Sequence, residues 1–287
     1  MWHLGSILIF VSCMILASCG RKDAAPVSEK PVLCVSIEPQ RKILSEIAGS
    51  GYEVVSLLGN GANPETFEPS VSQRMTLENS AAYFPVGYLP FEQRYSAALA
   101  GRVPVFGTSD GIEPVTGTHG HHEGGHGEAG ADPHVWTSLR NGHVIADNML
   151  RALVSLRPDS AEAYGERHAA LVARLDSLDR EAASRLAGAA VHGFAIWHPS
   201  LSYYARDYGL HQLSVGYESK DVSAGELSHV IEEARRDSVK VFFFQKEYDS
   251  RQARSINAEI GSRMVTIAPL AYDWDDEIMR ITDELAR

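Results

Sequence analysis

The sequence is short of positive charge. Its 287 residues include 26 Lys and Arg against 37 Asp and Glu, which gives a formal net charge of −11. Nucleic-acid binding normally requires a basic face, so this balance argues against a nucleic-acid partner. It suits a cationic partner, although acidity alone mostly reflects solubility. With 44% hydrophobic and 22% charged residues, the chain is an ordinary globular protein that can bury a core, in one large or two modest domains.

Long hydrophobic runs are scarce as well, and the notable one lies at the start. Ile7–Leu16 is apolar but too short to span a membrane stably, and it leads into Ala17-Ser18-Cys19. This arrangement resembles a bacterial lipoprotein signal, with a signal peptide over 1–18 and Cys19 as the lipidated residue, although Met1-Trp2-His3 lacks Lys and Arg. A buried helix is the alternative. Residues 19–30 are polar and contain proline like a tether, so we expect a lipid-anchored protein of the bacterial cell envelope, facing the periplasm or the exterior.

Cysteine is rare, and its placement is informative. Of the three cysteines, Cys13 would leave with the signal and Cys19 would carry the lipid, so only Cys34 remains. A disulfide within the mature chain is thereby excluded. Cys34 lies in the apolar run Val32–Val35, and we predict that it is an inert core residue.

Short apolar runs alternate with amphipathic helical patterns from Pro31 onward, without a repeat of short fixed period. This alternation is typical of βα units and a mainly parallel sheet. The predicted strands cover 32–37, 54–58, 82–85, 103–106, 191–197, 211–215, 239–244 and 264–267. The predicted helices cover 40–48, 91–99, 139–156, 201–208, 223–235, 250–260 and 274–285, besides a much longer one over 159–187. We therefore predict an α/β fold in which two βα lobes, residues 31–158 and 188–287, are joined by one long rigid helix.

Two histidines beside prolines are the best candidates for metal ligands. His134 lies in Asp132-Pro133-His134-Val135-Trp136, and His198 ends an apolar run in Trp197-His198-Pro199. The prolines restrain the backbone, and Asp132 is placed to orient a ring nitrogen of His134. A histidine beside an aromatic residue is often simply packed in the core. However, ligands of open α/β sheets bind outside the carboxyl ends of strands, and one histidine per lobe in such a place favours a shared metal ion.

Carboxylates complete the candidate set. Glu65, after Asn63-Pro64, would add an oxygen ligand; Glu68 competes for this role, and a solvated loop carboxylate is the alternative. A fourth ligand is expected from the loop 269–276. Asp273 is favoured there, because Asp275 and Asp276 are well placed to face the dipole in the first turn of a helix.

A long stretch without periodicity precedes His134. It ends in the loop 117–130, which contains His119, His121, His122 and His126 among Gly and Glu residues. Loops of this length are usually functional or disordered. A histidine-rich tract of this composition indicates an auxiliary metal-scavenging loop, with a solvated spacer as the alternative.

Taken together, these segments resemble the metal-specific class of ABC-transporter substrate-binding proteins, the zinc- or manganese-binding ZnuA/TroA-like family. In chain order the matching segments are Val35–Gln40, Gly61–Pro69, Asp132–Trp136, Trp197–Pro199, Tyr203-Tyr204, Tyr208–Leu210 and Pro269–Trp274. The resemblance implies two α/β lobes joined by one long helix, with the metal held between them. It also implies delivery of that metal to a membrane permease, and a histidine-rich loop is typical of the zinc-binding members.

The chain departs from the family pattern at two positions. The first histidine ligand of the family falls at Glu65, and the carboxylate often found before the last Pro-Leu falls at Ala268. The implied site is therefore Glu65, His134 and His198, with Asp273 or water as the fourth ligand. Imidazole suits zinc, whereas oxygen ligands shift the preference toward manganese or iron. Because the histidine-rich loop favours zinc, we predict Zn(II) as the transported ligand, with Mn(II) or Fe(II) as alternatives.

The resulting expectation is a monomeric binding protein, not an enzyme, that captures zinc and delivers it to an ABC transporter permease for import. A zinc hydrolase is one alternative, because two histidines and a glutamate with an open position form a known catalytic arrangement. The spacing His-Glu-x-x-His does occur, at His122–His126, but there it lies in the glycine-rich loop and not in a predicted helix. A surface adhesin lipoprotein is another alternative. It needs no metal, and it predicts that replacing His134 and His198 leaves function intact.

Overall fold

The computed structural model describes residues 30–59, 61–116, 130–189, 191–216, 224–245, 248 and 250–287. The predicted signal peptide, Cys19 and nearly all of the predicted tether lie outside these residues, as do the four histidines of the loop 117–130. Among the described residues, no helix is both long and apolar enough to cross a membrane.

The first lobe is built on a parallel sheet with strand order β2-β1-β3. The central strand β1 (Val32–Val35) pairs with β2 (Glu53–Ser56) on one side and with β3 (Ala82–Phe84) on the other. A central parallel strand is covered on both faces, which explains the uninterrupted apolar run of β1. Cys34, in this strand, is buried, and burial raises the pKa of its thiol to about 11, as expected for an inert core residue.

Three helices accompany this sheet: α1 (Glu38–Ala48), α2 (Val71–Glu78) and α3 (Pro90–Leu99). The short 3-10 turn η1 (Gly49–Gly51) follows α1. Ser70 caps α2 by accepting a hydrogen bond from the backbone N–H of Gln73.

The predicted strand 103–106 is wrong, because the structure has only an isolated parallel bridge between Tyr83 and Val105. The backbone oxygen of Pro104 accepts a hydrogen bond from Tyr83 N at 2.9 Å, and Phe106 N donates to Tyr83 O at 2.9 Å. Proline has no N–H to continue such a ladder, so the segment remains a brief edge contact.

The second lobe has a parallel sheet with strand order β5-β4-β6-β7. Its strands are β4 (Gly193–Ile196), β5 (His211–Ser214), β6 (Val241–Gln245) and β7 (Arg263–Ile267). Its helices are α6 (Ser202–Tyr208), α7 (Ala224–Arg236), α8 (Ser250–Ile260) and α9 (Trp274–Ala286). Parallel strands place their carboxyl ends at the same edge of each sheet, so the loops after β4 and β6 lie close together.

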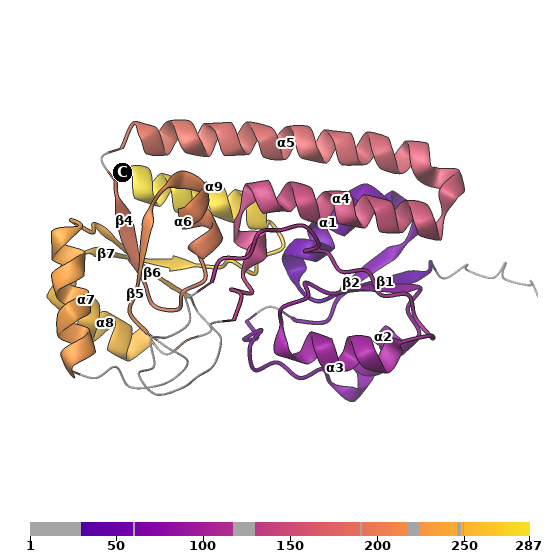
Figure 1. Cartoon of the computed structure of the whole chain (residues 1–287), viewed down its shortest axis with the longest axis horizontal. Coiled ribbons are helices and arrows are strands. Elements are labelled where there is room, and N and C mark those ends of the chain that lie inside the picture. Colours follow the sequence, from indigo (N-terminus) through magenta and orange to yellow (C-terminus); the bar gives the residue numbers. More distant parts are fainter. Residues whose placement is uncertain are drawn as a thin grey trace, which may run out of the picture.

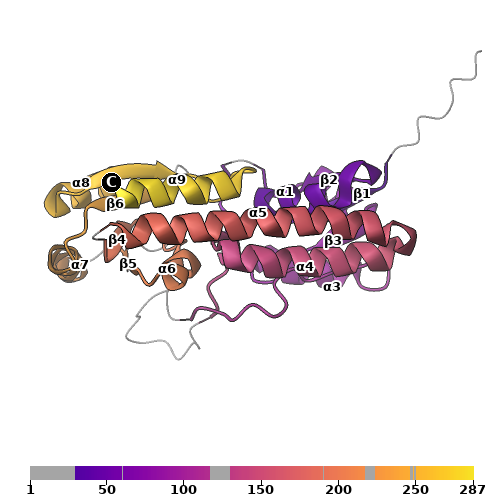
Figure 2. The same cartoon turned by 90° about the horizontal axis from the view of Figure 1, so that it is seen from above.

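One long helix connects the two lobes, as predicted. After the 3-10 turn η2 (Val135–Thr137), α4 (Leu139–Leu156) leads through η3 (Pro158–Ser160) into α5 (Ala161–Ala187). With 27 residues, α5 is about 40 Å long. It packs against α1 and α4 in one half of the molecule and against α9 in the other (Figure 1). Viewed from above, α4 and α9 lie on opposite sides of α5 (Figure 2).

The junction of the lobes is closely packed. A Cβ atom on Gly142 of α4 would lie 2.8 Å from the ring of Trp274, at the start of α9, so only glycine allows this approach. The main hydrophobic core runs continuously from β1 through α4 and α5 to α9. This shared core supports the reading of α5 as a rigid spine.

Candidate metal centre

His134 is held from one side by Asp132. The carboxylate oxygen Oδ1 of Asp132 accepts hydrogen bonds from the backbone N and from ring atom Nδ1 of His134, both at 2.8 Å. A carboxylate can only accept, so Nδ1 carries the hydrogen and Nε2 presents its lone pair. This is the arrangement that the sequence predicted for Asp132, and it is the usual outer partner of a metal-binding histidine.

The Asp132 carboxylate is fully buried. Burial alone would raise its pKa, but the contacts with His134 and a hydrogen bond from Ser202 hold that pKa well below its usual range. Asp132 is therefore ionised at neutral pH. In addition, its backbone oxygen accepts a hydrogen bond from Tyr203 Oη at 2.9 Å, which ties the segment before His134 to α6 of the second lobe.

His198 follows β4, at the carboxyl edge of the second sheet. Its backbone oxygen accepts a hydrogen bond from Ser200 N at 2.7 Å, which closes a tight turn around Pro199. Its imidazole ring is stacked on the Tyr248 ring, with a centroid separation of 4.7 Å and an interplanar angle of 18°. Both histidines are buried, so their rings are restrained by packing before any ligand arrives.

Glu65 lies in the turn that follows β2. The side chain of Asn63 accepts a hydrogen bond from the backbone N of Glu65 at 2.9 Å, a local Asx turn that sets the direction of the chain. The Glu65 side chain is only 13% exposed, and its Oε1 lies 3.3 Å from Nε2 of His198. It is thus not the solvated loop carboxylate that was the alternative. Glu68, the competing residue, is 55% exposed and pairs with Arg94 at 2.9 Å.

Glu65, His134 and His198 form one compact cluster, with one candidate ligand atom of each residue within 4.8 Å of the others. Nε2 of His198 is 3.2 Å from Nε2 of His134 and 3.3 Å from Oε1 of Glu65. Ligand atoms about 2.05 Å from a tetrahedral zinc ion are about 3.3 Å apart, so these two separations fit one ion. In the part of the chain that the structure describes, this is the one group of at least three His, Cys, Asp or Glu residues with such spacing.

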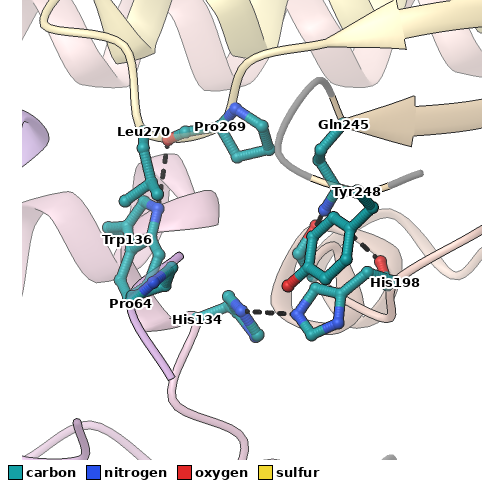
Figure 3. A pocket seen from close by; sticks show the side chains of 9 residues that line it. Pro64, His134, Trp136, His198, Gln245, Tyr248, Pro269 and Leu270 are labelled. Atoms are coloured by element: carbon teal, nitrogen blue, oxygen red, sulfur yellow. Dashed lines mark hydrogen bonds between the residues drawn. The ribbon is translucent and has the colours of Figure 1, made fainter. Parts of the chain in front are cut away.

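A pocket opens beside the two histidines. In Figure 3, His198, Gln245 and Tyr248 lie on one side of it, and Pro64, Trp136 and Leu270 lie on the other. Ser200 and Pro269 complete the lining. The indole Nε1 of Trp136 donates a hydrogen bond to the backbone oxygen of Pro269 at 3.1 Å, which links the segment after His134 to the loop before α9.

Asp273 lies apart from the cluster. Its carboxylate is 64% exposed and pairs with Lys42 of α1, at 3.0 Å. Lys42 also pairs with Asp275 at 2.6 Å, so the start of α9 is held to α1 by charge. The structure therefore brings together three of the four predicted ligands and gives Asp273 a different partner.

Gln245 and Tyr248 were not among the residues singled out from the sequence. Gln245 is the last residue of β6, where a strongly apolar strand ends on a polar side chain. The rule that pointed to His198, namely a polar residue at the carboxyl end of a strand, also applies to Gln245. Tyr248 carries no comparable signal, because its stacking on His198 is a contact between residues 50 positions apart.

A known protein family matches most of this chain. The family model for ZnuA, described as "Zinc-uptake complex component A periplasmic", matches residues 33–281. The chain belongs to this family. The resemblance inferred from the sequence segments is thereby confirmed. The family comprises binding components of metal uptake rather than enzymes, so it gives no support to the hydrolase alternative.

Curated and solved relatives agree with this placement. The zinc-binding lipoprotein AdcA of Streptococcus pneumoniae is 24% identical over 282 residues, covering 94% of this chain and 56% of AdcA. The chain thus spans little more than half the length of that curated relative. A crystal structure of ZnuA matches with a TM-score of 0.81 and 30% identity, covering 90% of this chain and 98% of that one. A ZnuA deletion mutant with zinc bound gives a TM-score of 0.80 and 29% identity, covering 90% and 97%. These matches confirm the predicted fold of two α/β lobes on a long helix.

Proposed function

We propose that this protein captures a divalent transition metal, with zinc preferred, and delivers it to the permease of an ABC transporter for import. Glu65, His134 and His198 are the ligands in this proposal, and the cargo is held between the lobes. The supporting observation is the pair of separations at His198 Nε2, 3.2 Å to His134 and 3.3 Å to Glu65, which fit a tetrahedral ion of zinc size.

The choice of zinc follows from the donor set. Two imidazoles and one carboxylate bind zinc well, whereas sites rich in oxygen ligands favour manganese. The relatives point the same way, because AdcA is named as zinc-binding and one ZnuA structure contains zinc. Mn(II) and Fe(II) are the alternatives, since one of the three donors is an oxygen.

We propose that residues 1–18 are a signal peptide, that Cys19 carries a lipid and that residues 19–30 tether a monomer to a membrane of the cell envelope. In this proposal the lobes 31–158 and 188–287 hold the metal between them and are joined by the linking helix 159–187. The histidine-rich loop 117–130 serves as an auxiliary metal-collecting segment.

The deciding experiment is the metal content of the chain from Lys22 onward. Wild-type protein is compared with Glu65→Ala, His134→Ala and His198→Ala variants and with a deletion of 117–130. The matched control is His229→Ala, because His229 is a 72% exposed histidine on α7. We expect one tightly held zinc in the wild type, the control and the deletion, and loss of it in the three single variants. Metal that is lost only with the loop would make the loop the binder and would disprove the proposed site.

Delivery requires a second experiment in cells. A strain that lacks this gene is grown under zinc limitation and supplied with wild-type protein or with a His134→Ala/His198→Ala variant. We expect only the wild type to restore zinc uptake. Restoration by the double variant would contradict metal capture by these residues. Failure of the wild type as well as the double variant to restore uptake would favour the adhesin alternative.

A further inference from the structure

Gln245 has an unexplained buried oxygen. Its side-chain Nε2 donates a hydrogen bond to Ser200 Oγ at 2.5 Å and lies 3.5 Å from the backbone oxygen of His198. The His198 oxygen can only accept, so the amide is oriented with nitrogen toward the His198–Ser200 turn. The other amide atom, Oε1, is buried and has no hydrogen-bond partner among the described residues. Buried polar atoms almost always have a hydrogen-bond partner. Oε1 of Gln245 therefore indicates that a bound molecule donates a hydrogen bond to it.

The pocket beside the histidines can hold such a partner. Gln245, which is 4% exposed, lines this pocket together with His134 and His198. The cavity volume of the pocket is about 20 Å³, and about 10–15 Å³ is enough for one water molecule. Apart from the histidines, Ser200, Gln245 and Tyr248, the lining is apolar or aromatic: Pro64, Trp136, Pro269 and Leu270. A water molecule in this pocket can therefore form hydrogen bonds with only a few of the lining side chains, and Gln245 is one of them.

Charge balance favours a neutral occupant. A divalent metal at the cluster meets two buried or nearly buried carboxylates, those of Glu65 and Asp132, which together neutralise it. A further anionic ligand would leave a net negative charge in a buried site, which is costly. Asp273 is engaged with Lys42, and the residue at the end of β6 is an amide rather than a carboxylate. Water is the neutral ligand that fits both the space and the acceptor.

We propose that Gln245 is a positioning residue that holds a water molecule as the fourth ligand of the captured metal. The water binds the metal through its oxygen and donates one hydrogen bond to Oε1 of Gln245. This inference rests on the proposed function, in which Glu65, His134 and His198 supply the other three ligands. Ser200 fixes the amide through Nε2, so that Oε1 stays turned to the water.

The test uses the mature chain loaded with one equivalent of Co(II). Electron paramagnetic resonance spectra are compared in ordinary water and in water enriched in the magnetic oxygen isotope, which broadens the signal only when a water oxygen binds the metal. The variants are Gln245→Met and Ser200→Ala, and the matched control is Gln93→Met at an exposed position of α3. Circular dichroism of each metal-free variant checks its fold. Zinc affinity is measured by competition with a chromophoric chelator.

We expect broadening in the wild type and the control, no broadening in Gln245→Met, and partial loss in Ser200→Ala. Zinc affinity should fall about 10- to 100-fold in Gln245→Met, the range usual for partners of metal-bound groups, and by less in Ser200→Ala. Absence of broadening in the wild type, or full broadening in both variants, would overturn the inference whatever the affinities are. Failure of the proposed function is a separate result: either the wild type binds no stoichiometric metal, or Glu65→Ala binds it as the wild type does.

Discussion

The Nε2 atoms of His134 and His198 lie 3.2 Å apart, although 64 positions separate these residues in the chain. One histidine precedes α4 and the other follows β4. Asp132 fixes the ring of the first, and the Tyr248 ring covers that of the second. Holding two imidazoles at this distance before a metal arrives lowers the ordering cost of capture, because little side-chain freedom remains to be lost.

Asp132→Asn tests the hydrogen bond that orients His134. An amide can donate to Nδ1 and so leave the hydrogen on Nε2, where it blocks metal binding. We expect zinc affinity to fall about 10- to 100-fold in a competition titration. The control is Asp237→Asn, which alters a surface pair with His211 whose atoms are 2.6 Å apart. Equal affinities for the two variants would show that the Asp132 contact is irrelevant to binding.

Glu65→His tests the role of the carboxylate in metal choice. A third imidazole in place of an oxygen donor should raise the ratio of Zn(II) to Mn(II) affinity by about tenfold or more, because nitrogen ligands suit zinc and oxygen ligands suit manganese. Calorimetric titration with each metal measures the ratio. Glu68→His is the control, since Glu68 is exposed and pairs with Arg94. A ratio unchanged by Glu65→His would mean that Glu65 does not bind the metal.

Asp273→Asn separates the predicted ligand role from the observed ion pair. Because this carboxylate is 64% exposed, we expect unchanged zinc affinity and a loss of at most about 1 kcal/mol in the free energy of unfolding. A fall in affinity as large as that of His134→Ala would instead restore Asp273 as a ligand.

Lys42→Met changes the other side of this contact. It leaves Asp275, whose side chain is 3% exposed, with Arg174 at 3.2 Å as its remaining cation among the described residues. Breaking a buried ion pair from one side costs on the order of 3 kcal/mol, and Arg174 should reduce that loss. Urea unfolding of the metal-free protein measures it. A loss no greater than that of Asp273→Asn would show that Lys42 contributes nothing through Asp275.

Glu92 should make stability depend on pH. Burial raises the pKa of its carboxyl from 4.5, although Ser36 Oγ and the backbone N–H groups of Leu89, Gly87 and Val86 donate hydrogen bonds to it. A carboxyl with a raised folded-state pKa contributes stability that is fully present below its unfolded pKa. That contribution is lost as the pH rises through the folded pKa.

The free energy of unfolding should therefore fall relative to Glu92→Gln as the pH rises from about 4 to about 7, because glutamine does not titrate. Urea unfolding of both proteins at several pH values gives this difference. A difference that stays constant, or that grows with pH, would contradict the raised pKa.

Several features were predictable because local chemistry decides them. Helix α4 begins at Leu139 and ends at Leu156 as predicted, since Ser138 caps it and Pro158 stops the pattern soon after. The alternation of apolar runs with amphipathic helices indicated parallel sheets, and both sheets are parallel. Prolines beside His134 and His198 marked two positions that proved to be neighbours. Only His198 follows a strand, however: the expected strand end at His134 is wrong, because an isolated bridge at Ala131 is the only β pairing just before it in the described residues.

Other features depended on contacts between distant segments. Residues 103–106 have the composition of a strand, but Pro104 and an edge position limit them to one bridge. The sequence placed Asp273 in the loop before α9 but could not show that Lys42 of α1 would face its carboxylate. Likewise, Oε1 of Gln245 lacks a hydrogen-bond partner among the described residues, which only the meeting of β6, the turn after His198 and the pocket reveals.

By itself, then, the sequence determined the order of most elements, the family and the two histidines beside prolines, because capping, periodicity and proline act over a few residues. Only the tertiary structure decided which carboxylate faces those histidines and where the pocket beside them opens. These depend on how α5 sets the two lobes, and side-chain direction across such an interface follows from packing over the whole chain.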